Sequence, residues 1–212
     1  MLISSLLQDP LIFVAYLVAI FYVLTVHEFS HALAALLAGD QTAKEMGRLT
    51  LNPFKHVDVL GLIVLFFAGF GWGKPVPINP NNFRRPRSGL FWVSLAGPLS
   101  NLISGIIFII LLRIVLTYTS LSAANLLVGF LLILIIINFT IFIFNLLPIP
   151  PLDGSKLLFS LLPEKFNKFK YWLSYYGPWL LIGLIILDNF TNLGIFSTIF
   201  TKFLSIISYL ID

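Results

Sequence analysis

Residues 121–147 read "LSAANLLVGFLLILIIINFTIFIFNLL" and contain no charged residue and no histidine. A helix needs roughly 20 predominantly apolar residues to cross the hydrocarbon core of a bilayer. Charged residues make up only 10% of the chain, against about 25% in a soluble globular domain. A chain with so little polar surface cannot shield its apolar residues from water, so we predict an integral membrane protein.

Other apolar segments alternate with polar loops, and together they predict an all-α multi-pass membrane protein with about five transmembrane helices. Residues 59–73 are too short and too rich in glycine to span comfortably, so a re-entrant segment is expected there. Prolines forbid a regular helix over 74–88, which predicts a short extended or β loop. We expect one domain over 1–212, with a core of about 6–160 and accessory helices at about 171–210. The predicted spans are 6–38, 90–116, 121–147, 171–187 and 193–210.

The net charge of +4 would suggest nucleic acid as a partner if the protein were soluble. Here most basic residues gather in three loops, at 39–56, 74–88 and 156–170, so they are expected to set the topology, and nucleic-acid binding is not expected. These loops are predicted to be cytoplasmic, with the N-terminus outside and the C-terminus inside. That topology requires residues 59–73 to enter and leave the membrane on one side.

The absence of cysteine excludes disulfides and thiolate metal ligands. The N-terminus is apolar but lacks a basic region and a small-residue cleavage pattern. It is therefore expected to begin the first helix rather than to be a removed signal.

Residues 25–36, "TVHEFSHALAAL", place three ionisable side chains in an apolar segment. Side chains four residues apart stack on one face of a helix, so His27 and His31 can present two nitrogens to one metal. Glu28 is offset by about 100°, close enough to contact a water on that metal but poorly placed as a ligand. This H-E-x-x-H pattern is the signature of zinc metalloproteases. Ionisable groups are costly inside a span, which favours a functional site over a structural histidine pair.

A catalytic zinc site needs a third protein ligand. Asp153 lies in "NLLPIPPLDGSKLL", where prolines and a glycine break the helix, and an aspartate in such a break can turn inward to a metal. The same residue could instead cap a helix that begins at "DGSKLL", and the residues alone leave both interpretations open. His56 lies in an exposed, charged loop and is expected to order that loop rather than to bind metal. The remaining candidates are Asp58, Glu164 and Asp188.

"HEFSH" followed by "NLLPIPPLDG" resembles the site-2 protease family of intramembrane zinc metalloproteases, which is peptidase M50-like. Residues 51–61 and 71–101 also look like this family, especially like its short prokaryotic members. The resemblance covers most of 20–160 in the family's order of motifs, whereas residues 171–210 match only by hydropathy. We recognise no PDZ-like or CBS-like module.

The resemblance implies that His27, His31 and Asp153 bind Zn2+ and that Glu28 is the general base. It also implies that Asn145 helps to hold the substrate carbonyl or the oxyanion, for which an interhelical hydrogen bond is an equal alternative. The function implied is hydrolysis of peptide bonds within or near transmembrane segments of membrane proteins.

The site is expected inside the cell membrane but nearer the cytoplasm, with a transmembrane protein or peptide as substrate and the lipid bilayer as surroundings. The rival functions are a metal-binding membrane transporter and a catalytically inactive scaffold. The substrate's identity, the trigger and the oligomeric state stay open.

Three further segments carry weaker expectations. Asn138 is expected to be structural, and the small residues of "AGPLSN", 96–101, are expected to let helices approach closely. Residues 69–83 are expected to lie beside the active site and to pair with an unwound, extended substrate as an added strand. A plain cytoplasmic connector is the alternative for this last segment.

Overall fold

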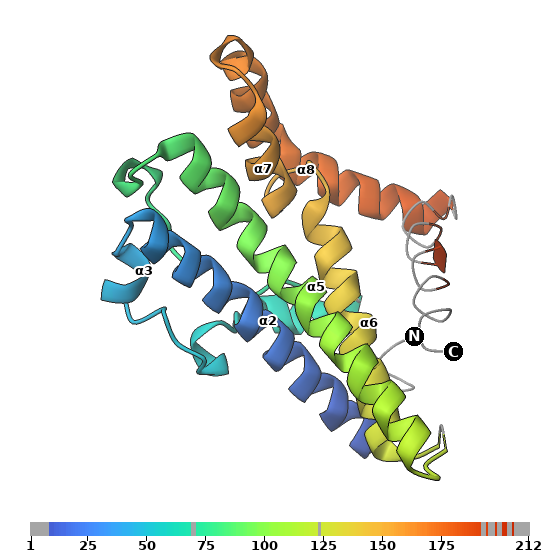
Figure 1. The fold of residues 1–212 in the computed structure, drawn as a ribbon. Coiled ribbons are helices and arrows are strands. Elements are labelled where there is room, and N and C mark those ends of the chain that lie inside the picture. Colours follow the sequence, from blue (N-terminus) through green and yellow to red (C-terminus); the bar gives the residue numbers. More distant parts are fainter. Residues whose placement is uncertain are drawn as a thin grey trace.

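The computed structural model describes residues 9–68, 71–122 and 124–191, together with residues 194, 198, 201, 202 and 205. Three of its helices are long and apolar enough to cross a membrane, α2 (Pro10–Ala38), α5 (Pro86–Tyr118) and α6 (Leu126–Leu146) (Figure 1). The protein is therefore an all-helical membrane protein. The predicted count of about five spans is not confirmed, because most of 193–210 lies outside the described residues.

Local sequence signals define where the long helices begin and end. The Asp9 side chain accepts hydrogen bonds from the N–H groups of Leu11 and Ile12, and Pro10 occupies the first helical position of α2. Gly39 ends that helix with a φ of 113°, a left-handed conformation that favours glycine. Asn125 caps α6 through the N–H of Leu127.

Helix α5 is the centre of the bundle, because it packs against α2, α6 and the short helix α7 (Asp153–Leu161). Figure 1 shows α2 and α5 side by side, with α6 crossing them. An apolar cluster joins α5 to α6 at one end of the bundle, and it consists of Ile109, Leu112, Val128, Leu131, Ile135 and Phe139. The other end of α5 borders the histidines of α2.

The chain between α2 and α5 folds back along α2. It forms α3 (Thr42–Glu45), η1 (Pro53–Lys55), α4 (Val59–Ala68) and η2 (Pro80–Asn82). The rings of Phe54 and Phe21 lie 6.3 Å apart, and those of Phe66 and Phe13 lie 5.7 Å apart. Residues of this connecting segment between α2 and α5 therefore contact the N-terminal half of α2. The segment itself begins at the opposite, C-terminal end of that helix.

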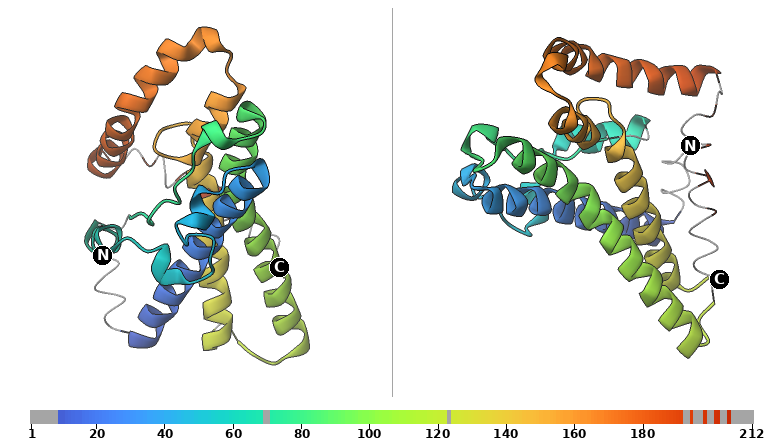
Figure 2. Two further views of the ribbon diagram at one scale, coloured as in Figure 1. Left: turned by 90° about the vertical axis from the view of Figure 1, so that its left-hand side faces the viewer. Right: turned by 45° about the horizontal axis from the view of Figure 1, so that its top comes forward.

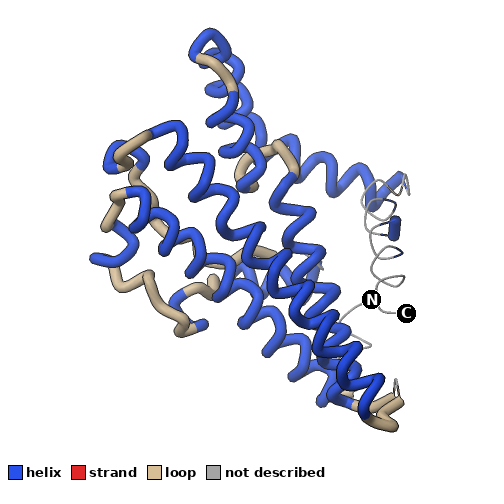
Figure 3. Tube along the Cα trace, in the orientation of Figure 1, coloured by secondary structure: helices blue, strands red, loops and turns tan. Residues whose placement is uncertain are grey.

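The extended stretch that follows α4 returns toward the other end of α2. An isolated antiparallel bridge joins Val57 to Gly73, and no strand forms among the described residues, as Figure 3 shows. The loop predicted over 74–88 is therefore only partly as expected: residues 74–79 form neither helix nor strand, but Pro80–Asn82 forms η2 and α5 already begins at Pro86.

Asp40 ties the last part of the connecting segment, around Asn79 and Asn82, to the C-terminal end of α2. Its buried carboxylate accepts hydrogen bonds from the backbone N–H of Asn79 at 2.7 Å and from the side-chain amide of Asn82 at 2.8 Å. The N–H and hydroxyl of Thr42 also donate to it. Burial alone would raise the pKa of Asp40, but these hydrogen bonds outweigh it and hold the pKa below its ordinary value.

After α7, η3 (Glu164–Phe166) leads into α8 (Asn167–Thr191), which runs away from the three long helices (Figure 2). Gly177 of α8 borders Pro150, since a methyl group at that glycine would lie 2.6 Å from the proline ring. The predicted helix at 171–187 lies within α8, but α8 is not among the helices that meet the criteria for a span.

Candidate metal centre and active site

Three side chains from α2 and α7 converge at one point inside the bundle. His27 and His31 present their Nε2 atoms 3.1 Å apart. The Oδ2 atom of Asp153 lies 2.9 Å from Nε2 of His31 and 3.2 Å from Nε2 of His27. All three residues are buried, and they form a group whose ligand atoms lie within 4.8 Å of one another. The structure thus brings together the three residues that the sequence predicts as metal ligands.

The opposite edge of each imidazole is fixed by an oxygen. Nδ1 of His27 lies 2.6 Å from Oδ1 of Asn101, and Nδ1 of His31 lies 2.6 Å from the carbonyl oxygen of Val93. If each Nδ1 donates its N–H to the oxygen behind it, each Nε2 is left to bind a metal on the side of Asp153. Two imidazole nitrogens and one carboxylate oxygen that converge on a single point are ligands that zinc takes in proteins. The donor set therefore fits a zinc ion.

Asn101 is a site residue that the sequence reading missed. The sequence predicts only helix packing for residues 96–101, which include it. Asn101 is nevertheless fully buried, and its amide group donates to Oδ1 of Asn138 and to the carbonyl of Val23, each at 3.3 Å. Asn138 in turn donates to the carbonyl of Leu134 at 2.8 Å. The sequence does contain a signal for such a role, because Asn101 is a polar amide in the middle of an apolar span, one helical turn from a glycine.

That glycine lies against the histidines. A methyl group at Gly97 would be 2.3 Å from Nε2 of His31 and 2.7 Å from Nε2 of His27. The predicted close approach of helices at "AGPLSN" is therefore confirmed, and the surface that α5 approaches is the candidate metal centre itself.

Asp153 is the first residue of α7, and its carboxylate points to the histidines instead of capping the helix. The N-cap is Leu152, which makes no side-chain capping bond. The capping alternative is therefore wrong. Nζ of Lys156 lies 3.0 Å from Oδ1 of Asp153, which leaves Oδ2 for the histidines. Lys156, one turn after the aspartate, was not identified from the sequence.

Gly154 allows this tight start of α7. A methyl group there would lie 2.3 Å from the carbonyl oxygen of Leu146 at the end of α6. Backbone atoms cannot move aside as a flexible side chain can, so the residue after the aspartate has to be glycine.

Glu28 lies beside the histidines but outside the ligand group. Its Oε2 accepts a hydrogen bond from the backbone N–H of Val76 at 2.8 Å. The same carboxylate lines a cavity of about 220 Å³ together with the three candidate ligands, Asn145, Lys156 and residues of the 71–78 stretch. Within the segment 69–83 that was expected beside the active site, residues of the 71–78 stretch thus border the candidate site. The N–H of Val76 is not free, however, because Glu28 already accepts it.

Comparison with known proteins decides the family. The model of peptidase family M50 matches residues 112–184. YwhC of Bacillus subtilis (strain 168), a candidate zinc metalloprotease, is 46% identical over 161 residues, which cover 74% of this chain and 74% of YwhC. The chain belongs to peptidase family M50, the site-2 protease family. Its enzyme class is that of a zinc metalloprotease.

More distant M50 relatives agree. Rip2 of Mycolicibacterium smegmatis, also named as a candidate zinc metalloprotease, is 35% identical over 139 residues, covering 62% of this chain and 51% of Rip2. Rip2 of Mycobacterium tuberculosis (strain H37Rv) is 34% identical over 141 residues, covering 64% of this chain and 52% of that protein. No solved structure gives a significant match.

Two remaining polar residues of this M50 protein are also placed. Asn145 lines the cavity, and its amide donates to the carbonyl of Ile141 in its own helix at 3.1 Å, so the one hydrogen bond described for it is not interhelical. His56 is not part of the ligand group. The exposed setting expected for it is wrong, since it is fully buried, with Nε2 2.8 Å from the carbonyl of Thr50. Its own carbonyl accepts the N–H of Lys74, which ties two loops together.

Proposed function

We propose that this M50 protein hydrolyses peptide bonds within or near transmembrane segments of membrane-protein substrates. The observation that carries the proposal is the position of the candidate metal centre on α2, a helix of spanning length and hydropathy. His27 precedes the end of that helix by 11 residues, which is about 16 Å along the axis at 1.5 Å per residue. This depth favours a site inside the membrane, nearer the end at which the basic loops gather.

The roles of the site residues follow from what each side chain contacts. We assign His27, His31 and Asp153 as the ligands of Zn2+, which supplies Lewis-acid polarisation of the scissile carbonyl and acidifies water next to it. Glu28 faces the same cavity without joining the ligand group, so it is the residue that accepts the proton of the attacking water and returns it to the leaving amine. Asn145 borders the cavity and is assigned to hold the substrate carbonyl or the oxyanion.

Substrate binding is assigned to the extended residues 74–78. A transmembrane helix keeps its peptide bonds hydrogen-bonded within itself, so it has to unwind locally before a carbonyl can reach the metal. An unwound segment needs backbone partners away from water, and extended backbone beside the cavity offers them by strand addition. When substrate occupies the site, Glu28 and the substrate backbone compete for the N–H of Val76.

The topology proposed from the sequence is retained. The loops after α2 and after α6 lie at the same end of the bundle in Figures 1 and 2, which agrees with a shared cytoplasmic location for their basic residues. The contact between Phe66 and Phe13 supports a re-entrant path for the segment around α4. We treat residues 1–212 as one multi-pass protease domain of the cell membrane.

The deciding experiment compares the wild type with Glu28→Gln and His27→Ala after reconstitution with a model transmembrane peptide. The wild type is expected to cleave the peptide and to contain zinc. Glu28→Gln should keep zinc and lose at least about 100-fold in cleavage rate, since general-base catalysis is worth roughly 10²–10⁴. His27→Ala should lose both. A zinc-containing wild type that cuts no peptide would point to a transporter or an inactive scaffold instead.

A further inference from the structure

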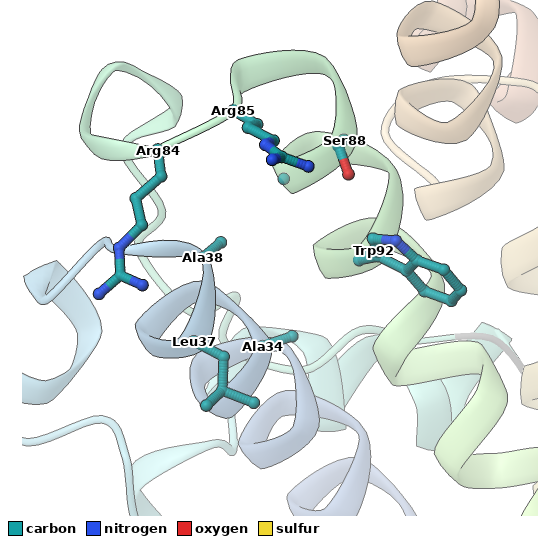
Figure 4. A pocket seen from close by; sticks show the side chains of 8 residues that line it. Ala34, Leu37, Ala38, Arg84, Arg85, Ser88 and Trp92 are labelled. Atoms are coloured by element: carbon teal, nitrogen blue, oxygen red, sulfur yellow. The ribbon is translucent and has the colours of Figure 1, made fainter.

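A second hollow lies on the bundle surface, between the last turns of α2 and the first turns of α5. It has a volume of about 520 Å³, and none of the proposed zinc ligands lines it. Its lining residues are Ala34, Leu37, Ala38, Arg84, Arg85, Ser88, Gly89 and Trp92, and we call this hollow the α2–α5 groove (Figure 4).

The groove has two chemically different parts. In Figure 4 the Arg85 side chain extends from the start of α5 toward Ser88, and Arg84 extends past the end of α2. The remaining wall is apolar, and its two large side chains are open, since Leu37 is 71% exposed and Trp92 is 59% exposed. A cationic rim over an apolar wall matches a ligand that is itself divided into an anionic head and a hydrocarbon part.

The two rim arginines lack acidic partners. Arg87, in the same segment, forms an ion pair with Glu164 at 2.8 Å. No ion pair involves Arg84 or Arg85 among the residues that the structure describes. Two adjacent cations without a protein counter-ion are free to bind an anion from outside the chain.

The position of the groove selects the kind of anion. It lies where α2 ends and α5 begins, so it is at the boundary between the apolar span and the basic loops. Tryptophan is the residue typical of that boundary. We propose that the α2–α5 groove binds an anionic glycerophospholipid, with its phosphate at Arg85 and Ser88, the charge of Arg84 at the far edge of the groove, and an acyl chain along Leu37 and Trp92. This rests on the membrane location of the protein and not on its proteolytic activity.

The test uses Trp92 as a reporter of what occupies the groove. The other tryptophans are replaced with phenylalanine (Trp72→Phe, Trp172→Phe, Trp179→Phe), and helix content is checked by circular dichroism. The full chain is placed in phosphatidylcholine vesicles that contain a fixed fraction of either brominated phosphatidylglycerol or brominated phosphatidylcholine. Brominated chains quench a tryptophan that they touch, so the ratio of the two quenching curves gives the relative affinity for the anionic lipid.

Arg85→Gln and Arg87→Gln form a matched pair, because each removes one charge from the same segment. We expect stronger quenching by the brominated anionic lipid, and a loss of roughly fivefold or more in relative affinity in Arg85→Gln, the order expected for one cation beside an anionic membrane surface. Arg85→Lys should retain the preference. Arg87→Gln, whose charge is already paired, should lose less than about twofold.

Four outcomes would overturn the proposal. Equal losses in Arg85→Gln and Arg87→Gln would mean general attraction to a charged surface. Equal quenching by both brominated lipids would mean that the groove does not select a headgroup. Relief of quenching by soluble glycerol phosphate would assign the rim to a free phosphate, and relief by an acidic peptide would assign it to a juxtamembrane protein segment.

Discussion

Nδ1 of His27 and Oδ1 of Asn101 lie 2.6 Å apart, and this contact joins α2 to α5 directly behind the candidate metal centre. The amide of Asn101 is itself held by Asn138 and by the carbonyl of Val23. Residues from three helices therefore hold the imidazole of His27 in place. The orientation of a metal ligand depends here on a side chain that never touches the metal.

Replacing Asn101 with leucine should weaken zinc binding by about 10- to 100-fold, the usual effect of removing the partner of a ligating histidine. The reason is that Nδ1 of His27 loses its acceptor and the other tautomer becomes accessible. Competition with a chelator measures the affinity. Asn145→Leu is the matched control, because the bond described for that amide is to its own helix. Unchanged affinity in Asn101→Leu would show that packing alone orients the ring.

Gly97→Ala should abolish zinc binding, since the added methyl group would lie 2.3 Å from Nε2 of His31. Metal content measured by atomic spectroscopy tests this, and circular dichroism reports whether the helices persist. Gly129→Ala is the control, because nothing lies within 4 Å of a methyl group there. Full zinc occupancy in Gly97→Ala would mean that α5 can shift away from α2 at little cost.

Asp153→Ala should lower zinc occupancy, whereas His56→Ala should leave it unchanged. Only the aspartate reaches the histidines, at 2.9 and 3.2 Å. Because His56 is fully buried and bonded to Thr50, its removal should reduce thermal stability instead. The two variants should therefore separate in a paired measurement of metal content and melting temperature, and a zinc-replete Asp153→Ala protein would remove this residue from the ligand set.

Lowering the pH should erase the advantage that Asp40 gives to the folded state. Its pKa is lower in the fold than in the unfolded chain, so the unfolded state takes up a proton first as the pH falls. The contribution is complete above the unfolded pKa of about 3.9 and disappears as the pH drops through the folded value. At neutral pH the melting temperature of the wild type should thus be higher than that of Asp40→Asn. This difference in melting temperature should disappear as the pH falls below about 4. A difference in melting temperature that does not change with pH would contradict this role of Asp40.

Single cysteines can test how substrate lies against residues 74–78, because the chain has no native cysteine. In a trapped Glu28→Gln complex, cysteines at Val76 and Ile78 should crosslink to residues that flank the scissile bond. Cysteines at Asn81 and Asn82, which lie in η2, should do so less. Equal crosslinking from all four positions would favour the connector interpretation.

The ligand group could be predicted from sequence because its geometry is local or motif-based. His27 and His31 lie one helical turn apart, so any α-helix through them brings both rings to one face. Asp153 is distant in sequence, and spacing alone could not separate a ligand from a helix cap. The resemblance to a family favoured the ligand, and the packing of α7 against α5 now places its carboxylate at the histidines.

The supporting residues could not be predicted, because their roles depend on which helices are neighbours. Asn101 and Lys156 carry no spacing signal toward His27 or Asp153, and only the packed bundle brings these atoms within hydrogen-bond distance. His56 looked exposed because Lys55 and Asp58 flank it. It is instead fully buried, and the backbone N–H of Lys74, 18 residues further along the chain, donates to its carbonyl.

The space at Gly97 has a consequence for reading relatives of this protein. Function can be lost there without any change to His27, Glu28, His31 or Asp153, because a single extra carbon would clash with the Nε2 atoms of both histidines. A homologue that keeps every ligand and the base but carries a larger residue at this point of α5 is expected to be a pseudoprotease. Sorting active from inactive members by their ligand motifs alone would misclassify such a homologue. Checking the residue that corresponds to Gly97 on α5 would classify it correctly.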